Sequence, residues 1–266
     1  MKVAVVQFNA RNKKAENISR GLRFVKKAAR AGAQFVLLPE TFNFRGTLDS
    51  RLAQDDVFET IPGESTRPFL VQAKELGVFI LLGSVYERSF TETNRAYNSS
   101  VLISRDGKIL AKYRKVNLFN AVIGAKTIRE SQTFLPGDKP TTVRVGDFNV
   151  GLSICYDLRF PEFYRQYAAR GCHVMTVPAS FTRATGKAHW ETLLRARAIE
   201  NLCYVLAPNQ CGKDGRGVAT FGNSLIIGPW GDVLARGSSG KEEILYADLQ
   251  MKAIRKAREA LPGVIK

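Results

Sequence analysis

The stretch GLSICYDLRFPE at residues 151–162 combines an apolar strand, a short polar turn and the start of a helix. Apolar residues over 149–154 predict a buried strand, and Pro161 is favourable in the first turn of a helix. Cys155 follows the end of that strand, where the backbone N–H groups of a strand-to-helix turn can hold an oxyanion. This position suits a nucleophile. The alternative is an inert thiol, because free cysteine is among the most buried residue types.

Strand–helix–strand units lie on both sides of this stretch, and hairpins such as the one at Asp106-Gly107 lie between them and at the end. The expected strands cover residues 2–8, 35–38, 78–86, 96–103, 108–113, 141–145, 149–154, 173–177, 203–207, 224–227, 233–235 and 244–248. The expected helices cover residues 64–76, 161–170, 188–201, a segment in which Ile18, Leu22, Val25 and Ala29 recur, and a short basic segment after residue 248. This mixture predicts an α/β fold, a layered sandwich with mixed sheets, in one domain over residues 1–266.

The 266 residues carry 40 basic and 24 acidic side chains, a net charge of +16, and 45% of them are hydrophobic. This composition is typical of a globular chain and excludes global disorder. The basic residues between Arg20 and Arg30 are expected on the solvent side of an amphipathic helix, so we expect no nucleic-acid partner. The positive charge does favour long-range attraction of small anions.

The sequence also limits where the protein acts and what it binds. No apolar stretch approaches the ~18 residues that a membrane span needs, and the first residues do not resemble a secretory signal. The four cysteines and two histidines lack the spacing of metal ligands. We therefore expect reduced thiols, a cytoplasmic setting, no membrane partner and no metal.

Two further segments place reactive groups after an apolar strand. Glu40 follows the apolar run at 35–39, where partial burial raises the pKa of a carboxyl group and suits a general base. An ordinary loop carboxylate is the alternative. The run KYRKVNL at 112–118 would stabilise a developing negative charge if one lysine points inward, and the alternative is a solvated face. A dyad of Cys155 with His189 stays open, although a structural histidine is simpler.

Together these segments resemble the nitrilase superfamily of carbon–nitrogen hydrolases. The motifs that carry the resemblance are LLPE at 37–40, YRKVNLF at 113–119 and CYDLRFPE at 155–162. ESQTFLPG at 130–137 is similar to the segment in which that family carries a second glutamate. The resemblance covers almost the whole chain and implies an α-β-β-α sandwich with mixed sheets.

The resemblance implies a mechanism without metal or organic cofactor. Glu40 would take the thiol proton of Cys155, and the thiolate would attack an amide carbonyl. Lys115 and the backbone N–H of Tyr156 would hold the oxyanion, while Glu130 would hold Lys115. Protonated Glu40 would release ammonia, and water would then hydrolyse the thioester.

Three more stretches resemble the Nit branch of the superfamily, at residues 178–201, 209–212 and 221–235. That branch contains deaminated-glutathione amidases and ω-amidases. The resemblance implies deaminated glutathione as the substrate. The alternatives are an ω-amidase for α-ketoglutaramate or α-ketosuccinamate, and another amidase or N-carbamoyl hydrolase of the superfamily.

Two positions beside the expected lysine depart from the family pattern. The family usually has His where Asn117 stands and often has Asp where Asn120 stands, and the loop over 121–129 is unusual for the branch. These departures flank Lys115. They therefore bear on the choice of substrate more than on the triad.

Substrate contacts are expected close to the nucleophile. Arg159 can clamp a carboxylate with two parallel hydrogen bonds, and a structural ion pair with Glu162 or Asp157 is an equal alternative. The other expected substrate-binding residues are Tyr156, Phe181 and Thr185. A small carboxylate-bearing amide would fit this set.

The resemblance also implies a homodimer or a larger even assembly. The expected contact segments are residues 193–201 and 155–170, whose alternating charges would form a self-complementary two-fold patch. A different class of function, a basic binding or scaffold protein on the same fold, is disfavoured because Glu40, Lys115, Glu130 and Cys155 are all present.

Overall fold

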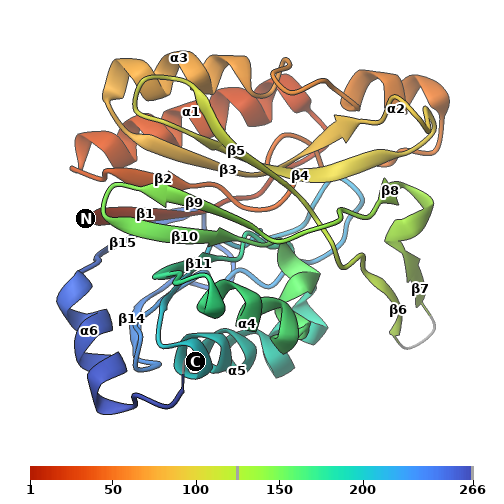
Figure 1. Ribbon diagram of the computed structural model, residues 1–266. Coiled ribbons are helices and arrows are strands. Elements are labelled where there is room, and N and C mark those ends of the chain that lie inside the picture. Colours follow the sequence, from red (N-terminus) through yellow and green to blue (C-terminus); the bar gives the residue numbers. More distant parts are fainter. Residues whose placement is uncertain (124–125, 265–266) are drawn as a thin grey trace.

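Two β-sheets lie face to face at the centre of the computed structural model, and helices cover the outer face of each sheet (Figure 1). The structure describes residues 1–123 and 126–264. Its layers run helix, sheet, sheet, helix, which confirms the expected α-β-β-α sandwich with mixed sheets.

The first sheet contains strands from both ends of the chain. They are β1 (Lys2–Gln7), β2 (Phe35–Leu37), β3 (Phe79–Arg88), β4 (Ala96–Ile103), β5 (Ile109–Arg114), β8 (Phe134–Leu135) and β15 (Glu243–Asp248). Their order is β15-β1-β2-β3-β4-β5, and β8 pairs with β4. β1, β2 and β3 are parallel, whereas β4 and β5 form the predicted antiparallel hairpin. Its turn residue Gly107 has a φ of 75°, which glycine adopts without strain.

The second sheet carries the stretch that holds Cys155. Its strands are β9 (Thr141–Val145), β10 (Phe148–Leu152), β11 (Val174–Thr176), β12 (Tyr204–Ala207), β13 (Leu225–Ile227) and β14 (Val233–Arg236), in the order β14-β13-β12-β11-β10-β9. β10, β11 and β12 are parallel. The expected hairpins β9–β10 and β13–β14 flank this parallel centre.

Six α-helices surround the sheets in the described part of the chain. They are α1 (Lys14–Arg30), α2 (Arg51–Val57), α3 (Arg67–Leu76), α4 (Pro161–Ala169), α5 (Arg183–Asn201) and α6 (Met251–Ala260). α1 and α3 lie outside the first sheet, and α4 and α5 lie outside the second (Figure 1). None of the helices within 1–123 and 126–264 has the length and apolarity of a membrane span.

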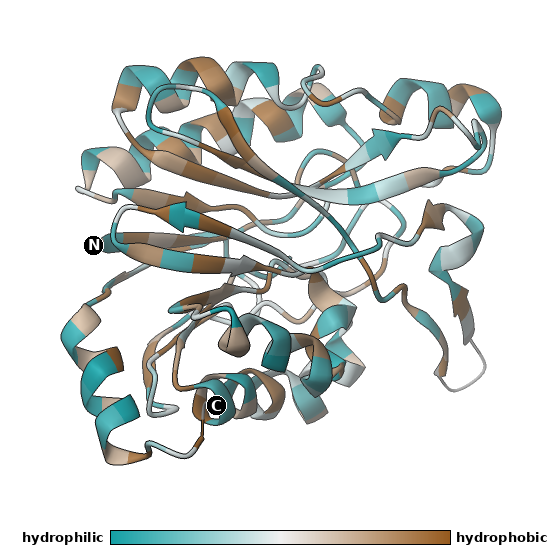
Figure 2. Ribbon diagram, viewed as in Figure 1, coloured by the Kyte–Doolittle hydropathy of each residue, from teal (hydrophilic) through white to brown (hydrophobic). Residues whose placement is uncertain are grey.

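The strands are apolar on both faces because both faces are covered. In β1, Val3 and Val5 pack between the two sheets, whereas Ala4 and Val6 pack against the helical layer. This division follows from the period of two in a strand, and it explains the continuous apolar runs. Figure 2 shows mostly hydrophobic residues along the central strands and mixed colouring on the outer helices.

Most predicted elements agree with the structure, and the differences have local causes. β10 ends at Leu152, two residues earlier than expected, and a 3₁₀ turn η2 (Cys155–Arg159) follows after Ser153 and Ile154. α5 begins at Arg183 and not at residue 188, because the Thr182 side chain accepts a hydrogen bond from the Thr185 N–H and caps the helix.

The short elements α2, β8 and a hairpin of β6 (Asn120–Ile123) with β7 (Lys126–Arg129) were not expected. Such elements are too short for hydrophobic periodicity to reveal them. The hairpin occupies the segment 121–129 that sequence analysis treats as an unusual loop, and residues 124–125 of that segment lie outside the described residues. A 3₁₀ turn η1 (Glu130–Gln132) follows β7.

Candidate active site

Glu40, Lys115 and Cys155 come from the ends of three strands. Glu40 lies shortly after β2, Lys115 directly follows β5, and Cys155 opens η2 after β10. Polar groups at such strand ends commonly meet at one edge of a layered α/β fold. All three are buried, and Glu130 joins them from η1.

The Lys115 ammonium lies between two carboxylates. Its Nζ is 3.0 Å from Glu40 Oε1, and 2.9 and 2.8 Å from the two oxygens of Glu130. Lys115 is only 1% exposed, so these ion pairs replace water around the ammonium. Two carboxylates against one ammonium leave one net negative charge beside Cys155.

Contacts from three other segments hold Glu40 and its backbone in place. Asn98 Nδ2 in β4 donates to Glu40 Oε1 over 2.9 Å, and the Gln210 side chain donates to the Glu40 carbonyl over 2.9 Å. The next residue, Thr41, has a φ of 49° and donates its N–H to Ser84 Oγ over 2.8 Å. These contacts leave the carboxylate little rotational freedom.

Cys155 adopts a left-handed backbone conformation with a φ of 48°. This conformation costs on the order of 1–3 kcal/mol for a non-glycine residue, so the surroundings must hold it. The Cys155 N–H donates to the Pro178 carbonyl over 2.9 Å. The buried Asp157 carboxylate accepts hydrogen bonds from the Ile154 N–H and the Tyr113 hydroxyl, at 2.8 and 2.7 Å, and so braces the turn.

Burial and the neighbouring charges set the protonation of the cluster. Burial raises the pKa of the Cys155 thiol well above its usual range, and the Glu40 charge raises it further. Burial also raises the pKa of Glu40, but the Lys115 ion pair outweighs burial, and the net shift is downward. Burial lowers the pKa of Lys115, yet Glu130 and Glu40 hold it well above its usual range. The expected upward shift for Glu40 is therefore wrong, and the resting site holds a thiol, an ionised Glu40 and an ammonium.

The two neighbouring cations of the 112–118 run point to a different carboxylate. Lys112 Nζ lies 2.5 Å from Glu87 Oε1, and Arg114 Nε lies 3.0 Å from Glu87 Oε2. Their alternation along β5 turns them away from the face that Tyr113 occupies. Lys115 is the lysine of this run that reaches Glu40.

Asn117 and Asn120, which depart from the family pattern, help to build the frame of the site. The N–H and Nδ2 groups of Asn117 donate to Asp157 Oδ1 at 2.9 and 3.0 Å. Asn120 Oδ1 accepts from the Ser131 N–H at 3.2 Å, next to Glu130. Both asparagines thus support segments that carry the buried charges.

The expected substrate-binding residues lie together. Tyr156, Arg159, Phe181 and Thr185 line one pocket with Cys155. Its volume is about 20 Å³, which accommodates about one water molecule. A substrate therefore needs a lining side chain to move, and the partly exposed Arg159 is the longest of them.

Arg159 has aromatic and histidine neighbours in place of a carboxylate. Its guanidinium lies 5.6 and 5.5 Å from the ring centres of Tyr156 and Phe181, and its Nη atoms lie 3.4 Å from His189 Nδ1. Within the described part of the chain these are its side-chain neighbours, and no ion pair joins it to Asp157 or Glu162, so that alternative is wrong. His189 is exposed beside Arg159, and no hydrogen bond to Cys155 supports a dyad between described residues.

Sequence reasoning missed three residues that shape the site. Asp157 lies inside the Cys155 motif and stabilises the turn there. The sequence does not show this function because its hydrogen-bond partner Tyr113 is distant along the chain. Asn98 begins a run of three polar residues, Asn98 to Ser100, inside an expected strand that ends in Val-Leu-Ile, and such a polar run in a strand is a readable signal. Gln210 belongs to the NQCG stretch, which was noted only for its family resemblance.

The other cysteines lie outside this cluster. Burial raises the pKa of Cys172 and of Cys211 to about 12, and it raises that of Cys203 as well. The Cys155 pKa is raised too, but these three thiols lack the neighbouring Glu40, Lys115 and Glu130 that could activate them during attack. Among the residues that the structure describes, no group of three His, Cys, Asp or Glu side chains is arranged to hold a metal ion.

An α-β-β-α sandwich with a buried thiol beside a carboxylate–ammonium–carboxylate cluster defines the nitrilase class of carbon–nitrogen hydrolases. The chain belongs to the carbon–nitrogen hydrolase family, whose model matches residues 2–259. It is a hydrolase that acts on carbon–nitrogen bonds other than peptide bonds, and its relatives lie in the Nit branch.

Relatives of two kinds resemble the chain over its whole length. It is 39% identical to a deaminated glutathione amidase of Synechocystis, over 98% of this chain and 96% of that one. It is 37% identical to human omega-amidase NIT2, over 98% of this chain and 92% of that one. The crystal structure of the Caenorhabditis elegans NitFhit protein matches with a TM-score of 0.90 at 31% identity, over 98% of this chain and 63% of that longer protein.

Proposed function

We propose that this protein is a thiol-dependent amidase that hydrolyses a small carboxylate-bearing amide, with deaminated glutathione as its substrate. The observation that carries the proposal is the Lys115 ammonium held between Glu40 and Glu130 beside the Cys155 thiol. Such a cluster can supply a base, a nucleophile and an electrostatic stabiliser at one point.

In the first half of the reaction, Glu40 accepts the Cys155 thiol proton as the sulfur attacks the amide carbonyl carbon. Because the thiol pKa is raised, the thiolate forms only during attack and does not accumulate beforehand. The carbonyl oxygen becomes an oxyanion, which Lys115 Nζ and the Tyr156 N–H stabilise. Glu130 keeps the ammonium charged and in place.

In the second half, protonated Glu40 transfers its proton to the amide nitrogen, the carbon–nitrogen bond breaks, and the amine leaves. The acyl group stays on Cys155 as a thioester. Glu40 then takes a proton from water, whose oxygen attacks the thioester carbonyl, and the sulfur leaves with that proton. A primary amide would release ammonia, whereas deaminated glutathione would release cysteinylglycine.

The substrate assignment rests on Arg159 and on the relatives. Arg159 lies in the Cys155 pocket with no carboxylate partner among the described residues, so it is available to a substrate carboxylate. Similarity to the Synechocystis enzyme favours deaminated glutathione, and similarity to human omega-amidase keeps α-ketoglutaramate as the second candidate.

The test is turnover of both keto-acid amides by the purified protein and by Cys155→Ala. We expect release of 2-oxoglutarate by the wild type and none by the variant, with circular dichroism spectra unchanged. Cys172→Ala should remain active, because that thiol lies outside the cluster. Absence of turnover on both amides would overturn the substrate assignment and favour another amide or an N-carbamoyl compound as the substrate.

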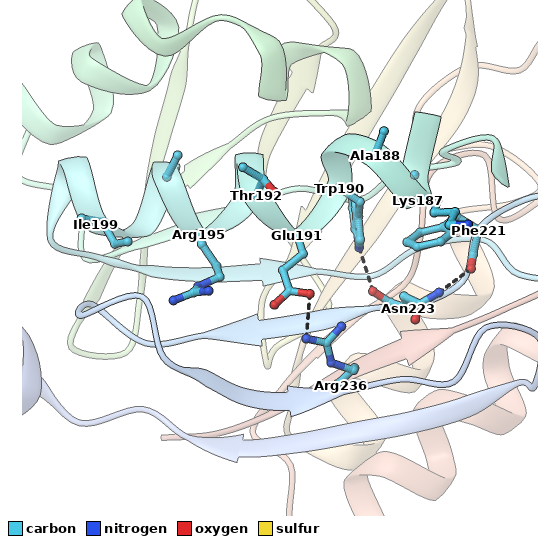
Figure 3. A pocket seen from close by; sticks show the side chains of 12 residues that line it. Lys187, Ala188, Trp190, Glu191, Thr192, Arg195, Ile199, Phe221, Asn223 and Arg236 are labelled. Atoms are coloured by element: carbon cyan, nitrogen blue, oxygen red, sulfur yellow. Dashed lines mark hydrogen bonds and ion pairs between the residues drawn. The ribbon is translucent and has the colours of Figure 1, made fainter. Parts of the chain in front are cut away.

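We also infer a cytoplasmic setting, which the four free, buried cysteines support. We further infer that two copies associate through the outer side of α5. A groove of about 460 Å³ runs along this helix and shares no lining residue with the Cys155 pocket (Figure 3). In it Glu191 pairs with Arg236 over 2.7 Å, and Ile199 remains 44% exposed. An exposed apolar residue flanked by both charge signs suits a self-complementary contact.

A further inference from the structure

A second group of charged side chains lies beside Glu40, built around the carboxylate of Asp214. Arg45 Nη2 lies 2.9 Å from Asp214 Oδ2, and Arg216 Nη2 lies 2.8 Å from the same oxygen. Two guanidinium groups therefore share one carboxylate, and the trio carries one net positive charge. Arg45, Asp214 and Arg216 are called the Asp214 cluster below.

Hydrogen bonds hold the cluster in a defined shape. Asp214 Oδ1 accepts from the N–H groups of Arg216 and Val218, both at 2.9 Å. The Gly215 N–H donates to the Arg45 carbonyl over 2.9 Å, which ties the loop to the segment after Glu40. The Asp214 side chain is only 2% exposed, so its carboxylate is a fixed anchor.

The loop over 211–220 that carries Asp214 connects two walls of the active site. Gln210, just before the loop, donates to the Glu40 carbonyl over 2.9 Å. Phe221, just after it, donates its N–H to the carbonyl of Phe181, which lines the Cys155 pocket, over 2.9 Å. The loop therefore runs from the Glu40 side of the site to the Phe181 wall.

Arg45 brings the cluster next to Glu40. Its Nη1 donates over 3.1 Å to the hydroxyl of Thr41, the residue that follows Glu40. Burial raises the pKa of Glu40 and Lys115 lowers it, and the positive charge of Arg45 lowers it further. The cluster therefore lies on the same side of the site as the residue that moves the proton.

Arg216 is the member of the cluster that can reach a ligand. Its side chain is 42% exposed, whereas that of Arg45 is 10% exposed. Burial lowers the pKa of Arg216, but Tyr86, Asp214 and Glu130 together raise it above its usual value. Arg216 is therefore charged and open to solvent, and it is held on the Glu40 side by Asp214, which also binds Arg45.

The proton that Glu40 gives to the leaving nitrogen indicates which part of the substrate lies near the Asp214 cluster. In the proposed reaction Glu40 protonates the leaving nitrogen, so the leaving amine lies against Glu40. Arg159, on the wall with Tyr156 and Phe181, is then left for the acyl portion. On the Glu40 side, Arg216 is the more exposed guanidinium of the Asp214 cluster, and it is therefore the cation of that cluster open to groups attached beyond the leaving nitrogen.

We propose that Arg216, held by Asp214 and Arg45, binds a carboxylate on the amine portion of the substrate. This rests on the proposed function and defines its substrate class as an amide with one carboxylate on the acyl part and another on the amine part. Deaminated glutathione has this form, because the cysteinylglycine that leaves ends in a carboxylate. α-Ketoglutaramate does not, because it releases ammonia.

The experiment compares kcat/KM of the wild type and Arg216→Gln on three compounds. They are deaminated glutathione, the same molecule with its C-terminal carboxylate converted to a carboxamide, and α-ketoglutaramate. Removing one charge-assisted contact should lower kcat/KM for deaminated glutathione about tenfold, which corresponds to about 1.4 kcal/mol. The values for the carboxamide and for α-ketoglutaramate should change less than about twofold.

Three further variants distinguish a specific Arg216 contact from a general electrostatic effect and from a damaged loop. Lys213→Gln removes the same charge from the same loop but leaves the Asp214 cluster intact, so it should affect the three compounds alike and weakly. Arg159→Leu should lower kcat/KM on all three, because each has the acyl carboxylate. Arg216→Lys should recover part of the preference for deaminated glutathione.

If Arg216→Gln lowers kcat/KM equally for the three compounds, or for none of them, the Arg216 assignment is overturned. The amidase proposal is left intact by that result. A wild-type enzyme that cleaves α-ketoglutaramate and rejects deaminated glutathione would also overturn it. A wild-type enzyme that cleaves neither would overturn both the proposed function and this subsite.

Discussion

Lys115 is the residue whose environment differs most from that of an ordinary lysine. Full burial opposes its charge, and only the paired carboxylates of Glu40 and Glu130 keep it protonated. The ammonium is thus positioned before any substrate arrives, and the protein does not have to reorient it during the reaction. Preorganised charge of this kind is commonly the largest single contribution to acyl-transfer catalysis.

The first prediction at this scale concerns Lys115 itself. Lys115→Gln should lower turnover by about 10²–10³, the usual cost of losing one oxyanion donor. Lys115→Arg should also be badly impaired, because the planar guanidinium does not fit the space of an ammonium. Steady-state kinetics gives the answer, with Lys112→Gln as the matched control, since Lys112 pairs with Glu87. A near-normal rate for Lys115→Gln would contradict the assignment.

The second prediction concerns how the charge of Glu40 changes the pKa of the Cys155 thiol. Burial and the negative charge of Glu40 both raise the thiol pKa, so Glu40→Gln should lower that pKa while it abolishes turnover. At a fixed pH above neutrality the variant should therefore hold more thiolate and less activity than the wild type. Thiolate absorbance as a function of pH measures this, against Cys155→Ala as the background.

Glu87→Gln serves as the control for that titration, because Glu87 binds Lys112 and Arg114. Its effect on the Cys155 thiol should be small. An unchanged or higher thiol pKa in Glu40→Gln would show that the two groups are not coupled.

In the wild type the acid limb of kcat/KM should lie below the usual pKa of a glutamate, because the pKa of Glu40 is lowered and activity is lost only when that carboxylate is protonated.

At the scale of elements, the β10–η2–α4 unit determines where the thiol points. β10 ends at Leu152, Asp157 bridges the turn, and α4 packs its Tyr167 ring against Gly151. A Cβ at position 151 would come within 2.8 Å of that buried ring. The strand and the helix therefore approach closely only because residue 151 is glycine.

Gly151→Ala is predicted to destabilise the protein by about 1–3 kcal/mol, because extra volume in a packed core forces neighbouring atoms to shift. Urea unfolding measures the change in the free energy of unfolding. Gly240→Ala is the control, since no described atom lies within 4 Å of a Cβ built there, and it should stay within about 0.5 kcal/mol. Equal effects of the two substitutions would mean that the contact with Tyr167 is unimportant.

At the scale of the whole molecule, we infer one domain. One hydrophobic core cluster includes Val3 near the start of the sequence and Ile254 in α6 near its end. β15 also pairs with β1 in an antiparallel register. Neither half could bury its central strands without the other.

The prediction at this scale is a dimer with twice the 29.5 kDa mass of one chain. Ile199→Asp should shift it to the monomer, because a charge would replace an exposed apolar side chain of the proposed contact along α5. Light scattering at micromolar concentration measures both proteins. Val71→Asp, a similarly exposed apolar residue on α3, is the control and should remain dimeric. A wild-type monomer would overturn the inference.

Local sequence was sufficient for most elements and for the chemical character of the site. The β4–β5 hairpin depends on an Asp-Gly turn, and the strands depend on continuous apolar runs, both of which act over a few residues. The nitrilase-type motifs also identify Glu40, Lys115 and Cys155 as one set of catalytic candidates. Short elements such as α2 contain too few repeats of the hydrophobic pattern to be predicted from the sequence.

The sequence by itself therefore determined which strands form and which residues carry the chemistry, because these depend on contacts close along the chain. Only the tertiary structure decided that Lys115 is held between both glutamates, that Arg159 has aromatic and histidine neighbours in place of a carboxylate, and that the pKa of Glu40 is lowered despite burial. It also joined Arg45 to Asp214 across 169 positions of the chain. Charge partners act through space, and spacing along a sequence does not record which side chains fold to within 3 Å of each other.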